Sequence, residues 1–154
     1  MANVAAICST FKQELLCGLH CLGTTEARNR TTADVLKAAL YYETEGDLGA
    51  ATTVYTTHGE VTTDGGYTTG GATVTNATEP GLTTTTAWWT PSGNLQWTSF
   101  TKVAFDALLL YNDSFATKRA IAVFNFGSQT VTAGTFTLTM PTNDASTGLI
   151  RLGD

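Results

Sequence analysis

The chain has 154 residues, of which 42% are hydrophobic and 14% are charged, and its formal net charge is −5. This length fits one domain, and the eight Lys and Arg residues are too scattered for a phosphate-backbone interface, so nucleic acid is not an expected partner. No apolar run approaches the ~20 residues of a membrane span, so no membrane contact is expected. The N-terminus lacks the pattern of a secretory signal, which predicts a protein made in the cytoplasm.

Threonine supplies about a fifth of the residues, whereas the charged fraction lies well below the roughly 25% of ordinary soluble domains. A surface that is rich in hydroxyl groups and poor in charge indicates that the protein is built of strands, or that much of its surface faces other protein and not bulk water. The composition therefore predicts a β-rich protein that works in an assembly.

The first segment, residues 1–23, is predicted to contain a short helix. Thr10 with Gln13 three residues later has the pattern of a capping box, which would start the helix near Thr10. Apolar residues recur at helical spacing, and glycines offer two possible C-terminal stops. The apolar stripe is Phe11, Leu15, Leu19 and Leu22, and the possible stops are Gly18 and Gly23.

All three cysteines lie in this segment, within "CSTFKQELLCGLHCL" at residues 8–22. At about 100° per residue of a continuous helix, Cys17 and Cys21 lie about 40° apart, whereas Cys8 is roughly opposite and His20 is displaced by about 60 to 100°. One metal ion cannot be reached by all four, and an odd number of cysteines excludes a complete disulfide framework. We therefore expect reduced thiols that fill small apolar spaces, with no metal and no cofactor.

Signals for catalysis are weak elsewhere in the chain. It contains no Gly-x-Ser-x-Gly nucleophile elbow and no Gly-x-x-x-x-Gly-Lys-Ser/Thr phosphate loop. The acidic residues Glu43, Glu45 and Asp47 lack the ligand spacing of a calcium loop and are interpreted as a solvated loop. No catalytic residue is predicted, and we expect the protein not to be an enzyme.

Residues 24–82 are predicted to be Thr/Gly-rich strands and loops. The polar run at 24–33 is interpreted as a loop, and "DVLKAALYY" at 34–42 is ambiguous between a helical turn and a buried strand, with the strand favoured. From residue 44 to 82, glycine pairs mark turns between short strands. The expected anchors of these strands are Val54, Tyr55, Val61, Tyr67 and Val74.

Residues 83–154 are predicted to supply the core strands. "TTTTAWWT", "LQWTSFTKVAFD", "ALLLYN", "RAIAVFNFG", "TFTLTM" and "GLIRL" have strand patterns, and the continuous apolar run "ALLLYN" indicates a strand buried on both faces. In the second of these strands, Leu95, Trp97, Val103 and Phe105 should share one face. Turns are predicted at Pro91–Asn94, Gly127-Ser128, Ala133-Gly134 and Pro141–Asp144. The whole chain, 1–154, is thus predicted to be a single mainly β domain, a β-sandwich or jelly-roll-like fold with a short N-terminal helix.

Three tryptophans fall on adjacent predicted strands. Strand alternation sends Trp88 and Trp89 to opposite faces, so that one belongs to the core and the other to the surface or an interface. Flat rings at Trp88, Trp89 and Trp97 could also stack on sugars, but a core or protein-interface role is favoured over a glycan platform.

Several blocks of the chain, taken in order, resemble a known family. They are "STFKQELLCGLHCL", "LKAALYY", "ATTVYTTHGEVTTDGGYTTGG" and the run from "FDALLLYNDSF" to "GLIRL". Together they are similar to small virion structural proteins of tailed double-stranded DNA bacteriophages, over nearly the full length. Cys17 and Cys21 stand where that family has other residues, and the segment at 26–34 is longer.

The resemblance implies a non-enzymatic component of a virus particle. We expect a capsid decoration or cement protein that stabilises the assembled head, with copies of itself and virion proteins such as the major capsid protein as partners. A tail, neck or head-fibre-base component is the alternative, and a carbohydrate-binding β-sandwich module is a further one. The interface residues expected in this interpretation are Phe11, Leu15, Leu19, Trp88 and Trp89.

Overall fold

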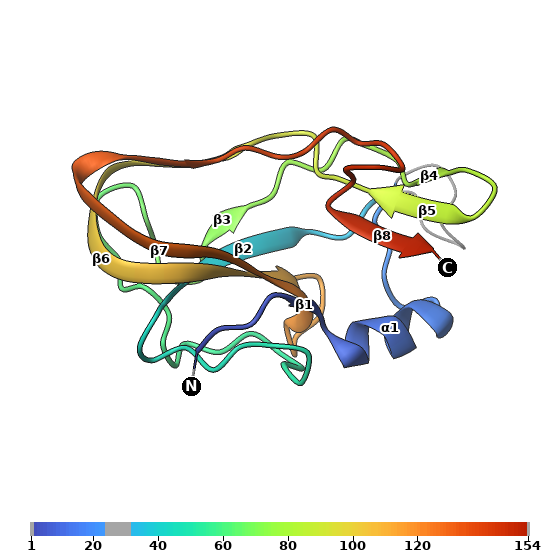
Figure 1. Cartoon of the computed structure of the whole chain (residues 1–154). Helices are drawn as coiled ribbons and strands as arrows, with labels where there is room; N and C mark the ends of the chain where they lie inside the picture. The colour runs from blue at the N-terminus through green and yellow to red at the C-terminus, as the bar shows by residue number, and fades with distance from the viewer. Residues whose placement is uncertain (1, 24–31, 154) are drawn as a thin grey trace.

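The computed structural model describes residues 2–23 and 32–153, so most of the predicted loop at 24–33 lies outside the described residues. Within the described ranges the chain forms one short helix and eight strands, which build two antiparallel sheets (Figure 1). The prediction of a mainly β, sandwich-type fold with a short N-terminal helix is confirmed.

The larger sheet has five strands in the order β1-β7-β6-β2-β3, and the smaller sheet has three in the order β4-β5-β8. The elements, in chain order, are β1 (Ala6–Ile7), α1 (Ser9–Leu16), β2 (Leu36–Tyr42), β3 (Ala72–Thr73), β4 (Gly81–Leu82), β5 (Thr86–Trp89), β6 (Leu95–Asn112), β7 (Arg119–Leu138) and β8 (Ile150–Gly153). The predicted strands at "LKAALYY", "TAWW" and "GLIRL" are confirmed by β2, β5 and β8.

The β6–β7 hairpin organises both layers of the fold. Its strands pair from Asn112 with Arg119 next to the turn to Leu95 with Leu138 at the far end. The hairpin bends and returns above the sheet, so that one pair of strands contributes to two layers (Figure 1). Four register irregularities fall between Trp97 and Ala107, which is where β-bulges bend a ribbon and increase its twist.

Two predicted turns, at Gly127-Ser128 and Ala133-Gly134, were wrong, because both pairs lie inside the 20-residue strand β7. Gly127 and Ala133 do have positive φ angles, 77° and 45°, as a turn would require. Gly127 and Ala133 lie in β-bulges and not in turns, because β7 pairs with β6 on both sides of each residue.

The same bulges overturn the prediction that Val103 shares one face with Leu95, Trp97 and Phe105. Leu95, Trp97 and Phe105 are at most 4% exposed, whereas Val103 is 62% exposed. Ala104 has a φ of 51° and the register shifts between Lys102 and Phe105, so strict alternation along the strand is lost there.

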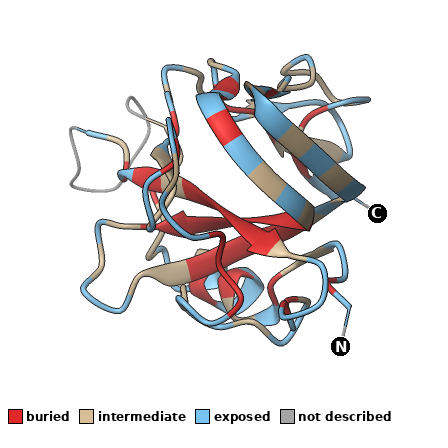
Figure 2. Cartoon of the chain, turned by 90° about the vertical axis from the view of Figure 1, so that its left-hand side faces the viewer, coloured by how far each residue is buried: buried red, intermediate tan, exposed pale blue. Residues whose placement is uncertain are grey.

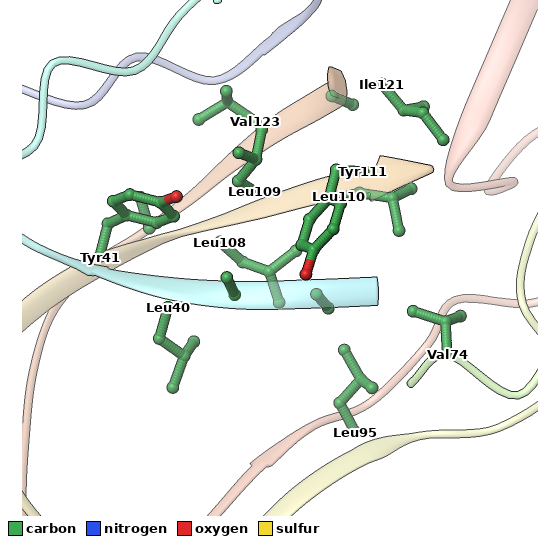
Figure 3. Packing of buried hydrophobic residues seen from close by; sticks show 14 of the residues in the cluster. Leu40, Tyr41, Val74, Leu95, Leu108, Leu109, Leu110, Tyr111, Ile121 and Val123 are labelled. Carbon is green, nitrogen blue, oxygen red and sulfur yellow. The ribbon is translucent and has the colours of Figure 1, made fainter. Parts of the chain in front are cut away.

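The run from Ala107 to Tyr111 is buried on both faces of the larger sheet, as predicted, with no residue more than 4% exposed. Figure 3 shows Leu109 and Tyr41 on one side of the strands and Leu40 and Leu95 on the other. One face is covered by α1 and the segment after β2, and the other by the returning half of the hairpin (Figure 1). Buried residues accordingly follow the central strands, and the outer segments are mostly exposed (Figure 2).

The core is not confined to residues 83–154. Strand β2 lies between β6 and β3, and five of its seven residues are buried. Its pairing runs from Leu36 opposite Asn112 to Tyr42 opposite Phe105. The segment that was predicted as strands and loops therefore also supplies a central strand.

The Thr/Gly-rich segment after β2 is held by a buried carboxylate in place of regular strands. Glu60, which is 5% exposed, accepts hydrogen bonds from the hydroxyls of Tyr55 (2.5 Å) and Tyr67 (2.7 Å) and from the amide of Gly70 (2.6 Å). The Tyr111 hydroxyl donates to the carbonyl of Gly70 at 2.6 Å. Burial, reinforced by the negative charge of Glu60, raises the pKa of Tyr67 far above its usual value, so this hydroxyl stays protonated.

The predicted capping box in α1 was wrong. The N-cap is Cys8, which makes no side-chain capping bond, and the hydroxyl of Thr10 is buried without a hydrogen-bond partner among the described residues. The Cys8 amide donates to the carbonyl of Ile121 at 2.9 Å, so pairing of the preceding segment with β7 decides where the helix begins. The helix ends at Leu16, and Gly18, with a φ of 66°, supplies the stop that was one of the two predicted.

Candidate functional site

A groove of about 190 Å³ lies between α1 and the three-stranded sheet. Among the described residues, its lining side chains are apolar or aromatic apart from one histidine. They are Phe11, Leu15, His20, Leu22, Pro80, Ala87, Trp88, Trp89, Ile150 and Leu152.

Four of the five residues predicted to form an interface line this groove, namely Phe11, Leu15, Trp88 and Trp89, although α1 and β5 are about 70 residues apart in sequence. Phe11 and Trp89 are 0% and 1% exposed and so belong to the core of the subunit. Leu15, Trp88 and Leu19 are half-buried, which leaves part of each side chain open to a partner.

On the sheet side, an apolar stripe crosses all three strands. Leu82 pairs with Ala87, and Ala87 pairs with Leu152. Residues directly opposite each other in antiparallel strands point to the same face, so these three side chains lie in a row. Leu82 is 75% exposed and Leu152 is 44% exposed. The sheet thus extends the lining of the groove into an exposed apolar surface.

Trp88 packs between two glycines. A Cβ atom built on Gly81 would lie 2.4 Å from the Trp88 indole, and one built on Gly148 would lie 2.9 Å from the Cβ of Trp88. Both positions therefore need glycine. The prediction that Trp88 and Trp89 face in different directions accords with their burial, since Trp89 is in the core and Trp88 is half-buried.

On the helix, Leu16 is an exposed apolar residue that sequence reasoning missed, and it does not line the groove. Its side chain is 92% exposed, and it directly follows Leu15 in α1. The helical spacing of Phe11, Leu15 and Leu19 identifies the face of the helix that packs inward, as amphipathic patterns do. Leu16 lies outside this stripe, and from that position the sequence could have predicted an exposed leucine.

A buried polar network supports the α1 end of the groove. The His20 side chain is fully buried, and its Nε2 lies 2.7 Å from a Glu14 carboxylate oxygen. The Arg119 guanidinium donates to the other oxygen of Glu14. The side-chain amide of Asn112 lies 3.1 Å from Nδ1 of His20. These contacts join Glu14 of α1 to His20 and to the facing ends of β6 and β7.

The network continues from Asn112 to the segment that follows α1. The Asn112 amide also donates to Asp34 at 2.6 Å, and Asp34 accepts from the backbone amide of Cys21 at 2.8 Å. Phe115 contacts both the His20 ring, at 5.9 Å between centroids, and the Arg119 guanidinium, at 5.0 Å. These contacts fix residues 17–23 against the ends of β6 and β7, and so position the helix that forms one wall of the groove.

The predicted placement of Cys17 and Cys21 on one side of a continuous helix was wrong, because α1 ends at Leu16. Cys17 is exposed, whereas Cys8 and Cys21 are buried, and no disulfide joins these described residues. Burial raises the pKa of the Cys8 thiol to about 11, which keeps it uncharged. Among the described residues, no group of three or more His, Cys, Asp or Glu side chains could hold a metal ion.

The tryptophans do not form a common flat surface. Trp97 is 2% exposed and stacks on Phe136 with 5.9 Å between ring centroids, and Trp89 is 1% exposed. Of the three rings considered for sugar stacking, Trp88 alone is partly accessible. This burial favours a protein-packing role for the aromatic residues.

Comparison of the chain with family models, with curated proteins and with solved structures finds no match. Across the described residues, no helix is long and apolar enough to cross a membrane. What can be inferred about function therefore rests on the sequence pattern and on the groove.

Proposed function

We propose that the protein is a non-enzymatic structural component of a virus particle and that it attaches to other protein chains through the groove between α1 and the three-stranded sheet. The observation that carries the proposal is an apolar groove whose sheet wall continues into exposed apolar residues. Leu152, which lines the groove, is 44% exposed, and Leu82, in the same row of the sheet, is 75% exposed. Exposed apolar patches of this kind mark protein contacts more often than free surface.

The specific form that we propose is a decoration or cement protein on the assembled capsid. The sequence resemblance to phage virion proteins supports this form, as does the low charged fraction of 14%. A protein that binds only the assembled lattice stabilises that lattice by mass action. A tail, neck or head-fibre-base component would use the same groove in a ring or around an axis.

The use of the buried polar groups also favours a structural role. Glu14 and Glu60, which are the buried glutamates among the described residues, are hydrogen-bonded by side chains of this chain, and so is the buried Asp106, which accepts from Asn3 at 2.6 Å and Asn125 at 2.8 Å. Glu14 and Asp106 join segments that are distant in sequence, whereas Glu60 holds together one segment, from Tyr55 to Gly70. Their hydrogen bonds stabilise the fold that presents the groove.

The first experiment is to quantify this chain in purified virus particles by mass spectrometry with isotope-labelled peptides. Hundreds of copies per particle are expected for a capsid decoration protein. A dozen or fewer would assign it to the tail or neck. Absence of the chain from particles purified to homogeneity would refute the virion proposal.

The second experiment tests the groove with exposed positions, so that folding is preserved. Leu82→Asp and Leu152→Asp should each lower incorporation into particles at least tenfold, because a charge would be buried at the contact. Val103→Asp is the matched control, since Val103 is 62% exposed and lies among the register irregularities of β6. The bend of the β6–β7 hairpin is at the end of the molecule away from α1 and β8 (Figure 1). Unchanged incorporation of both groove variants, with wild-type thermal stability, would show that the groove is not the attachment surface.

A further inference from the structure

A second cavity, of about 140 Å³, lies between the two layers of the sandwich. Its floor is the inner face of the larger sheet, with Ala38, Leu108 and Leu110, which are at most 4% exposed. Leu95 and Leu138, which pair with each other at the far end of the hairpin, lie on the returning half of the hairpin. The cavity thus lies between the two halves of the same bent hairpin and is partly open to the surface.

The mouth of the cavity is formed by half-buried residues, including Phe124, Phe126, Met140 and Leu149. Among the described lining residues no side chain is charged, and Thr139, which is exposed, is the one with a polar side chain. A buried water needs two to four polar partners, which this lining does not supply. Water is therefore a poor occupant, and the apolar walls favour an apolar one.

We propose that this inter-layer cavity binds a small uncharged apolar molecule, of about the size of benzene. A cavity of about 150 Å³ lined by Leu, Ile and Phe is large enough to hold benzene, and the volume here is close to that. The rings of Phe124 and Phe126 suit an aromatic occupant, and Met140, with its flexible thioether, can adapt to its shape. The site is separate from the groove and does not depend on the proposed virion role.

Benzene is the probe for the first test, which uses the full chain. Thermal unfolding is measured at increasing benzene concentration, and the methyl and aromatic resonances are followed by NMR in the same titration. Saturable binding is expected, and at a free concentration ten times Kd the folded state is favoured about elevenfold, which raises Tm. Pyridine has a similar size but carries a ring nitrogen that the walls cannot hydrogen-bond, so we expect at least tenfold weaker binding. No saturable benzene binding, or equal binding of pyridine, would refute the proposal.

Variants locate the binding site. Ala38→Leu fills the floor, and Leu149→Trp fills the mouth from a half-buried position that tolerates a larger side chain more easily. Each should weaken benzene binding at least tenfold, and the second variant decides the matter if the first does not fold. Leu152→Ala, in the groove between α1 and the smaller sheet, is the matched control and should leave the benzene Kd within twofold of wild type. A folded Leu149→Trp variant with unchanged benzene affinity would show that benzene binds elsewhere.

Discussion

The hydroxyl of Tyr67 offers a quantitative test of how the Thr/Gly-rich segment is held on the sheet. Tyr67 is fully buried, and its hydroxyl donates to Glu60 at 2.7 Å and accepts from the Leu40 amide at 3.0 Å. Tyr67→Phe removes both bonds. A hydrogen bond to a charged group contributes about 1.5 to 3 kcal/mol, and a buried donor left without a partner costs about 1 to 3 kcal/mol. We therefore expect the free energy of unfolding to fall by about 3 kcal/mol.

The matched control is Tyr42→Phe, in the same strand as Leu40. The Tyr42 hydroxyl makes a 3.4 Å contact with the Thr62 hydroxyl at an exposed position, so its loss should cost less than about 0.5 kcal/mol. Both variants keep the aromatic ring, and so the comparison isolates the hydroxyl.

Urea unfolding, followed by circular dichroism and by tryptophan fluorescence, measures both changes. An unchanged m-value would show that the variants alter stability and not the extent of unfolding. If the free energies of unfolding of the two variants differ by less than about 1 kcal/mol, the inferred role of the Tyr67–Glu60 pair is wrong.

Further predictions concern alkaline pH, thiol reactivity and the packing of the smaller sheet. Burial raises the pKa of Tyr41 and Tyr67 far above the usual value of 10.0, so above pH 10 the unfolded chain releases protons that the folded chain keeps. Stability should then fall by roughly 2 kcal/mol per pH unit, measured by urea unfolding; a flat profile up to pH 11.5 would contradict this. A thiol reagent should label Cys17 within minutes in the native state and the other two cysteines only on unfolding, and rapid labelling of all three would overturn the burial assignment. Gly81→Ala should lower the free energy of unfolding by more than about 1 kcal/mol, because the new Cβ would lie 2.4 Å from the indole ring of Trp88. The control Gly49→Ala, whose new Cβ would have its nearest contact at 3.8 Å, should change the free energy of unfolding by less than about 0.5 kcal/mol. Equal effects of the two variants would refute the clash.

The strands that could be predicted were those whose pattern reflects local burial. The apolar run from Ala107 to Tyr111 is too continuous for a strand with one wet face, and the structure buries it on both faces. β2, β5 and β8 were likewise recognisable from short apolar or β-prone runs. In these elements, the residue types and the tertiary environment agree.

The errors have a common cause in strand pairing. Gly127 and Ala133 have the positive φ angles of turns, yet pairing with β6 continues past both of them. A bulge and a turn make similar demands on local backbone, and whether a partner strand is present decides between them. Strand pairing also explains why Val103 is exposed, and why α1 begins at Ser9 without the expected capping box.

The groove could be predicted in its residue types but not in its assembly. The apolar stripe of α1 and the tryptophan pair were both recognisable as candidates for contact. Only the packing of α1 near β5 and β8 shows that Leu15 and Trp88 line one groove. It also shows that Phe11 and Trp89 are buried in the core, and that Leu82 and Leu152 are exposed positions at the groove.

Residue types along the chain were sufficient to establish a mainly β fold with one short helix near the N-terminus, because strand and helix patterns depend on which side chains avoid water. The tertiary structure alone decided that one hairpin bends to form both layers, that a cavity of about 140 Å³ remains between its halves, and that His20 joins Glu14 and Asn112. The physical reason is that bends, cavities and buried polar networks depend on contacts between segments far apart in sequence, and a local pattern carries no record of its distant partner.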